Sequence, residues 1–249
     1  MKVAVLSYSA DTGKTVLARH LLRPRIEAAG MCAVSPYTPL DGRRILDVMQ
    51  KMLRVQNMVL DVPYWQTEAV VQSFVEYRSA HEDYDFFVIP TIVGSERVLR
   101  GTIKTISALQ KIGVPAERIR VVFNCIERWM DLSKVFAPLF GYWNAEKAFV
   151  WNAAAVIHQS ELFDQTYHSE LTFADFLQIP IDLREDLPAI DDAKEREAYI
   201  RWGVVQRMVP GVVAELDAVF QTLLEAPSAS LMHYGANTSM VAGSVSALS

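Results

Sequence analysis

The sequence predicts an α/β fold: a three-layer, doubly wound and mostly parallel sheet, with a helical C-terminal portion. Short apolar runs of the kind found in buried strands alternate repeatedly with longer segments of helical periodicity. The spacing between successive runs is long enough for the helical crossovers that parallel strands need. A polar loop that ends in Gly13, Lys14 and Thr15 directly follows the first run.

The composition of the chain agrees with this fold and argues against one class of DNA-binding protein. The chain has 249 residues, of which 51% are hydrophobic and 21% charged, so it can bury one sizeable core. We expect a single domain over residues 1–225 and a flexible, uncharged tail over residues 226–249. The net charge of -5 argues against a protein whose whole surface binds DNA.

The cysteines and the hydropathy pattern predict where the protein works. Cys32 and Cys125 show neither metal-ligand spacing nor a disulfide-framework pattern, which favours a reducing compartment. No stretch approaches the roughly 18 consecutive apolar residues that a membrane-spanning helix needs. We therefore expect a cytoplasmic protein without a membrane span.

The first strand is predicted over residues 2–6, and a helix from about Gly13 toward Ala29. The loop between them has the layout of a phosphate-binding loop. Backbone N–H groups in such a loop and at the helix N-terminus lack internal partners, and the helix dipole adds positive charge, so together they can hold an anion. The predicted nucleotide-binding residues of this loop are Ser9, Ala10, Asp11, Thr12, Gly13, Lys14, Thr15 and Val16.

Two residues of the loop have predicted chemical roles. Lys14 would contact the β- and γ-phosphates as a positive charge, and the hydroxyl of Thr15 would bind Mg²⁺. Tyr8 stands where the full Gly-x-x-x-x-Gly-Lys-[Ser/Thr] motif begins with glycine. An ordinary polar turn between a strand and a helix is therefore the alternative interpretation.

The first helix carries polar residues away from its apolar stripe. Pro24 should kink or end the helix, because its ring clashes with the carbonyl of His20. The basic residues off the stripe predict a solvated face, with a contact to nucleic acid or a partner as the alternative; they are Arg19, His20, Arg23 and Arg25.

Two aspartates follow in the next part of the chain. A second strand is predicted over residues 31–35, and a helix over residues 43–54. Asp41, in the loop between them, is either the N-cap of that helix or a catalytic carboxylate that positions the attacking water. The apolar run 58–60 ends in Asp61. Because parallel strands point their carboxyl ends at the ligand crevice, Asp61 can hold Mg²⁺ together with Thr15; a capping aspartate is the alternative.

The middle of the chain completes the sheet. Strands are predicted over residues 84–90 and 119–124, with a helix ending at Ile112 between them. Asn124 closes the second of these strands. Its amide could read the edge of a nucleotide base, or Asn124 could simply form a turn.

The last third of the chain is aromatic and helical. Residues 148–157 predict the last core strand, and short helices are predicted between Phe163 and Leu177. The longest helical pattern covers residues 191–224, with an expected kink at Pro210.

Several segments together resemble the StbB plasmid stability proteins, which are relatives of the ParA/MinD group of P-loop ATPases. The resemblance covers most of residues 1–225. It implies a sheet of the P-loop NTPase type, with ATP and Mg²⁺ as cofactors. The segments that carry it are 9–15 with 18–22, 59–62, 84–91 and 113–124.

The resemblance also implies a function and a partner. The function would be in plasmid stability, plasmid partition or conjugative transfer, through nucleotide-dependent switching and weak Mg²⁺-dependent ATPase activity. The partner would be a small DNA-binding plasmid protein, which gives an indirect association with plasmid DNA, and a homodimer is left open.

Differences from the wider ParA/MinD pattern favour a second hypothesis. Ser9 occupies the place of that group's signature lysine, Ala10 and Asp11 replace glycines, and no glycine follows Asp61 closely. The alternative is a degenerate, non-hydrolysing nucleotide-binding adaptor that binds a partner protein through its C-terminal half.

Overall fold

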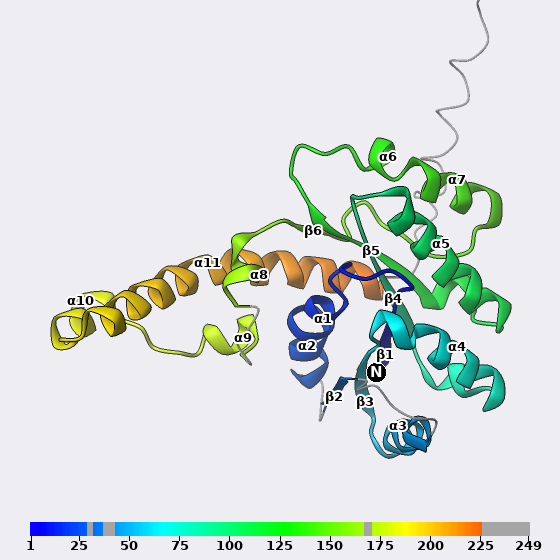
Figure 1. Ribbon diagram of the computed structural model, residues 1–249, viewed down its shortest axis with the longest axis horizontal. Helices are drawn as coiled ribbons and strands as arrows, with labels where there is room; N and C mark the ends of the chain where they lie inside the picture. The colour runs from blue at the N-terminus through cyan, green and yellow to red at the C-terminus, as the bar shows by residue number, and fades with distance from the viewer. Residues whose placement is uncertain (29–31, 37–42, 167–170, 226–249) are drawn as a thin grey trace, which may run out of the picture.

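The computed structural model describes residues 1–28, 32–36, 43–166 and 171–225. The predictions made for Asp41 and for the tail 226–249 lie outside these ranges. A six-stranded sheet in the order β2-β3-β1-β4-β5-β6 forms the centre of the molecule (Figure 1), and every neighbouring pair of strands in it is parallel. The predicted α/β class with a parallel sheet is confirmed. The strands are β1 (Lys2–Val5), β2 (Cys32–Pro36), β3 (Asn57–Asp61), β4 (Phe86–Ile92), β5 (Ile119–Ile126) and β6 (Val156–His158).

Helices connect and cover these strands. The helices and helical turns before β4 are α1 (Lys14–Val16), the π-helical segment η1 (Leu17–Leu22), α2 (Arg23–Ala28), α3 (Arg43–Arg54), η2 (Tyr64–Gln66), α4 (Thr67–Glu76) and η3 (Ala80–Asp83). Those after β4 are α5 (Glu96–Lys111), η4 (Ala116–Arg118), α6 (Leu132–Val135), α7 (Ala137–Glu146), α8 (Glu161–Gln165), α9 (Phe173–Phe176), α10 (Leu183–Asp186), η5 (Leu187–Ala189) and α11 (Ala193–Leu224).

Two apolar cores lie on opposite faces of the sheet. Alternate residues of a strand point to opposite faces, and Ala4 of β1 accordingly belongs to one core whereas Val3 and Val5 belong to the other. The first core is closed by α4, α5 and α7, and the second by η1, α2 and the C-terminal half of α11. The sheet is therefore the middle of three layers (Figure 1).

The strand order places the loop after β1 at the point where the winding of the sheet reverses. β1 lies between β3 and β4. The chain leaves β1 to build β2 and β3 on one side, then crosses back to build β4 on the other. In open parallel sheets the crevice at such a point, outside the carboxyl ends of the strands, is where ligands bind.

The first helix runs across Pro24 instead of ending there, because the segment before it is widened into the π-helical η1. The carbonyl of His20, which a regular helix would pair with residue 24, accepts a 2.9 Å hydrogen bond from Nη1 of Arg25. The predicted solvated face is wrong for two of its residues. His20 is 4% exposed, and Arg25 forms a 2.7 Å ion pair with Asp217 of α11.

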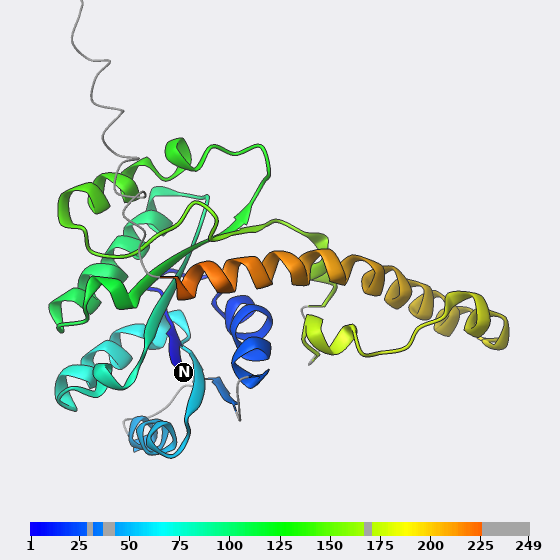
Figure 2. The ribbon, with the colours of Figure 1, turned by 180° about the vertical axis from the view of Figure 1, so that it is seen from behind.

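The N-terminal half of α11 extends beyond the sheet, with α9 and α10 alongside it (Figures 1 and 2). Phe176 of α9 stacks on Trp202 of α11 at a ring distance of 5.2 Å. The helix is continuous from Ala193 to Leu224 across Pro210. Among the described residues, no helix is both long enough and apolar enough to cross a membrane.

Candidate functional site

The loop after β1 has a backbone that requires glycine at one position. Gly13 has a φ of 81°, a left-handed conformation that costs side-chain-bearing residues energy. A Cβ atom at Gly13 would also lie 2.0 Å from Nδ2 of Asn124. Asp11, with a φ of 55°, is left-handed too. The N–H of Leu17 donates to the carbonyl of Gly13 at 2.9 Å and so begins the helical hydrogen bonding directly after the loop.

Side chains from α4 and α5 hold the start of the loop in place. The N–H of Tyr8 donates to Oγ1 of Thr105 at 3.0 Å, and the hydroxyl of Thr67 donates to the carbonyl of Ser7 at 3.0 Å. Ser9 packs so closely on Gly101 that a Cβ there would lie 1.9 Å from its hydroxyl oxygen. The loop therefore has a defined shape before any ligand binds.

Lys14 is buried in the loop. The residue is 8% exposed, and its ammonium donates a 2.8 Å hydrogen bond to the carbonyl of Ser9. Burial lowers the pKa of Lys14, while the nearby carboxylates of Asp61 and Asp11 oppose that shift. An ammonium with one carbonyl contact retains donors that could meet an anion.

Thr15 and Asp61 meet at the carboxyl end of the sheet. Asp61 is the last residue of β3 and lies in register with Val5 of β1, so the strand end carries it to the start of α1. The hydroxyl of Thr15 donates to Oδ2 of Asp61 at 2.7 Å. Burial raises the pKa of Asp61, whereas this hydrogen bond and the charge of Lys14 oppose the shift.

Asn124 reaches the loop from β5. Its Nδ2 donates to the carbonyl of Thr12 at 3.1 Å, and the side chain is buried. One amide donor thus fixes the turn before Gly13. That Asn124 reads a base edge stays a prediction.

The structure brings together the predicted loop residues, Asp61 and Asn124 at one edge of the sheet. Asp11 is exposed, Ala10 and Val16 are partly exposed, and Ser9 is buried. The hydroxyl of Thr12 is buried without a hydrogen-bond partner among the described residues. An unpaired buried hydroxyl in a loop of this kind is unusual in a native protein.

Tyr8 has a contact that sequence reasoning missed. The ammonium of Lys104 lies 3.9 Å from the centre of its ring, and Lys104 also forms a 3.4 Å ion pair with Glu68. Burial and a hydrogen bond to Glu68 raise the pKa of Tyr8. The residue that departs from the glycine of the motif therefore attaches the loop to α4 and α5. No local pattern in the sequence predicts this contact, because Glu68 and Lys104 are far from Tyr8 in the sequence.

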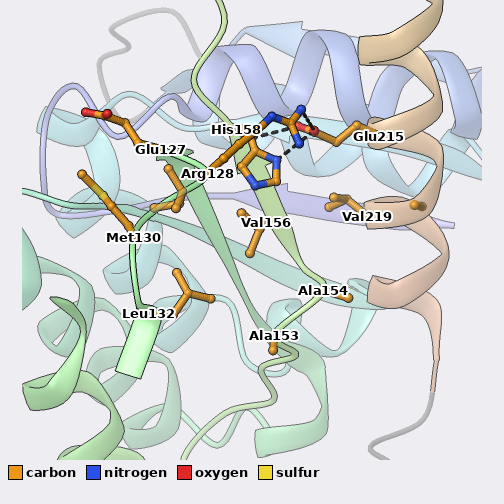
Figure 3. A pocket seen from close by; sticks show the side chains of 12 residues that line it. Glu127, Arg128, Met130, Leu132, Ala153, Ala154, Val156, His158, Glu215 and Val219 are labelled. Carbon is orange, nitrogen blue, oxygen red and sulfur yellow. Dashed lines mark hydrogen bonds and ion pairs between the residues drawn. The ribbon is translucent and has the colours of Figure 1, made fainter. Parts of the chain in front are cut away.

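A pocket of about 330 Å³ opens further along the same edge of the sheet. It begins at Ile126, two residues after Asn124, and is lined by the segment from there to Leu132, by β6 with the residues just before it, and by α11 (Figure 3). Within it, Glu215 of α11 contacts Nδ1 of His158 at 2.9 Å and Nη2 of Arg128 at 3.4 Å. Local sequence patterns do not pair His158 with Glu215, because the two residues are 57 positions apart.

The oxygen donors at this edge suit a hard cation. Among the residues that the structure describes, no group of three or more His, Cys, Asp or Glu side chains is placed to hold a metal ion. Mg²⁺ usually takes one or two protein oxygens and completes its shell with water and substrate phosphates, so the hydroxyl of Thr15 and the carboxylate of Asp61 fit it.

Comparisons with known proteins give no family assignment: no protein-family model matches the chain, and no curated protein matches it.

Proposed function

We propose that this chain is an ATP-binding protein of the P-loop type, and that it uses ATP with Mg²⁺ as a nucleotide-dependent switch. The single observation that carries the proposal is the 2.7 Å contact between Thr15 and Asp61, beside a buried lysine at the end of a glycine-containing loop. A hydroxyl after the loop lysine and a carboxylate at a neighbouring strand end form the usual protein contribution to a Mg²⁺–triphosphate site.

Each residue has a role in this proposal. Lys14 neutralises charge on the β- and γ-phosphates, and the N–H groups of the loop and of α1 bind phosphate oxygens. Thr15 and Asp61 would hold Mg²⁺, which would supply positive charge to offset the negative charge that develops during phosphoryl transfer. Asn124 keeps the turn around Thr12 and Gly13 in shape.

We assign the nucleoside end of ATP to the pocket that starts at Ile126. Two observations support this assignment: the pocket begins at the carboxyl end of β5, and Asn124, which contacts the loop, is separated from it only by Cys125. Its volume of about 330 Å³ is within the usual range for small-molecule sites.

The biological setting of the proposal rests on the resemblance to StbB proteins. In this setting the chain works in the cytoplasm, in plasmid stability, partition or conjugative transfer. Its nucleotide state controls contact with a small DNA-binding plasmid protein, so that its association with plasmid DNA is indirect.

A second candidate function is a non-hydrolysing adaptor, and one observation favours it. The backbone N–H of Val62 is already bonded to the carbonyl of Val5 at 2.9 Å, and Pro63 has no N–H. The two residues after Asp61 therefore have no free backbone donor for a γ-phosphate. In this version the chain binds ATP, does not cleave it, and contacts its partner through the C-terminal half.

Titration calorimetry with ATP and ADP in the presence of Mg²⁺ tests the proposal. Lys14→Ala should weaken ATP binding at least about tenfold, or about 1.4 kcal/mol. Lys111→Ala, which removes an exposed ammonium at the far end of α5, is the matched control and should bind almost normally. Equal binding by the wild type and Lys14→Ala would refute the proposal. Release of inorganic phosphate then separates the two versions: steady release favours the switch, and tight binding without release favours the adaptor.

A further inference from the structure

Arg120 occupies a position that the fold otherwise fills with apolar residues. It lies on β5, in register with Val88 of β4, and faces the core that contains Val122 and α11. It is 5% exposed. The site lies at the amino-terminal edge of the sheet, opposite the loop, because Arg120 is the second residue of its strand.

The guanidinium of Arg120 lacks the partners that its burial demands. Its Nε and Nη1 are buried and have no hydrogen-bond partner among the described residues. Its contact is with the face of Phe86, at 5.0 Å from the ring centre. Burial lowers the pKa of Arg120, and the charge of Glu117 opposes the shift. A buried charge without a partner costs several kcal/mol, so an apolar side chain would be the more stable choice at this position.

Arg25, which is partly buried, shows how this chain pairs the two terminal nitrogens of a guanidinium, although its Nε has no partner among the described residues. Its guanidinium donates to the carbonyls of His20, Leu21 and Val213 at 2.9 to 3.1 Å and also pairs with Asp217 at 2.7 Å. Arg120 has no comparable set of partners among the described residues. The contrast indicates that the group that pairs with Arg120 does not belong to the described residues of this chain.

A hollow of about 710 Å³ opens at Arg120. Its apolar lining comes from Met1, Phe86 and Leu224, and its charged lining includes Asp85, Glu117 and Arg118 besides Arg120. A guanidinium pairs with a carboxylate through two parallel hydrogen bonds. The two acidic residues at the rim would repel a doubly charged phosphate, whereas the apolar residues suit a hydrocarbon body.

We propose that this hollow is a second ligand site, in which Arg120 binds the carboxylate of a small monocarboxylic acid whose apolar body packs on Phe86 and Leu224. The site is independent of the ATP site in position and in chemistry. The protein would thus bind a second small molecule, at the edge of the sheet away from the loop.

The first test uses the full chain and three probes: benzoate, its neutral counterpart benzamide, and inorganic phosphate. The Nε–H resonance of Arg120 is followed by NMR and is assigned by its loss in Arg120→Lys. We expect benzoate to shift this resonance in a saturable way, benzamide to leave it unchanged, and phosphate to bind at least about tenfold more weakly. An equal response to benzoate and benzamide, or tighter binding of phosphate, would overturn the proposal.

Variants test which residue carries the binding. Arg120→Met should fold, because replacing an unpaired buried charge with an apolar side chain is often neutral or stabilising, and it should lose benzoate affinity at least about tenfold. Arg118→Met, which removes the other arginine of the hollow, should stay within about threefold of the wild type. Unchanged affinity in Arg120→Met would contradict the proposal. Should that variant fail to fold, the resonance shift in the wild type decides the matter.

The two proposals fail separately. Lys14→Ala should lose ATP and keep benzoate, whereas Arg120→Met should lose benzoate and keep ATP. Loss of benzoate binding in Lys14→Ala would show that benzoate occupies the loop, and would refute the second site.

Discussion

The hydroxyl of Thr15 donates a 2.7 Å hydrogen bond to the carboxylate of Asp61, a residue 46 positions later in the chain. The contact exists because β1 and β3 are neighbours and Val5 lies opposite Asp61 in their register. The end of one strand and the first turn of the helix after the other strand thus come together. The pair places a hydroxyl and a carboxylate at the edge of the sheet where Lys14 is buried, and the proposed function depends on this arrangement.

Substitution of Gly13 tests whether the shape of the loop matters. Gly13→Ala should destabilise the protein by at least about 2 kcal/mol, because alanine is strained in a left-handed conformation and its Cβ would collide with Asn124. It should also weaken ATP binding at least about tenfold. Urea denaturation and calorimetry measure the two effects. In the double variant Gly13→Ala, Asn124→Ala the collision is gone and the backbone strain remains. Its loss of unfolding free energy should therefore be smaller than the sum of the losses in the two single variants.

Much of this arrangement could be predicted from the sequence because it is local. The first strand, the loop and the following helix are contiguous, and a carboxylate at the end of an apolar run has few places to lie in a parallel sheet. The predicted strand ending at Asp61 and the predicted helix over residues 43–54 correspond to β3 and α3. The proposed role of these residues remains a prediction.

The surroundings of the first helix could not be predicted in the same way. His20 is polar by composition, but it stacks on Phe173 at a ring distance of 4.0 Å, and that residue is 153 positions away. Arg25 is partly buried and pairs with Asp217 of α11. Helical periodicity reports which residues share a face; it does not report which later segment covers that face. The burial of Arg120 could likewise not be predicted, because the pattern around it indicates only a buried strand.

Stability should fall in mildly acidic solution because of His20. Its burial lowers its pKa from 6.5 to about 4, so below pH 6.5 the unfolded state takes up a proton that the native state does not. The contribution of neutral His20 is therefore complete above pH 6.5 and is lost progressively as the pH falls toward 4, by about 3 kcal/mol in total.

Urea denaturation of the wild type and of His20→Gln between pH 4.5 and 7.5 measures this effect. Glutamine does not titrate, so the difference in unfolding free energy between the two proteins should shrink as the pH falls. A difference that is constant over this range would show that His20 does not carry the proton linkage.

Tyr8 should act as a structural anchor of the loop. Tyr8→Gly restores the glycine of the motif, yet we expect it to lower the unfolding free energy by about 1 to 2 kcal/mol, from the lost cation–π contact with Lys104 and the added freedom of glycine. Tyr8→Phe keeps the ring and should cost less than half as much. Thermal and urea unfolding check both values, and a Tyr8→Gly protein more stable than the wild type would refute this role.

The most direct test of the proposed function is the effect of Mg²⁺ on ATP binding in two Thr15 variants, measured by titration calorimetry with and without the metal. Thr15→Ser keeps the hydroxyl, whereas Thr15→Val keeps the shape without it. We predict that Mg²⁺ strengthens ATP binding by the wild type and by Thr15→Ser. In Thr15→Val, the factor by which Mg²⁺ increases ATP affinity should be at least about tenfold smaller. An enhancement in Thr15→Val equal to that of the wild type would contradict the assignment of Thr15 and Asp61 to the metal.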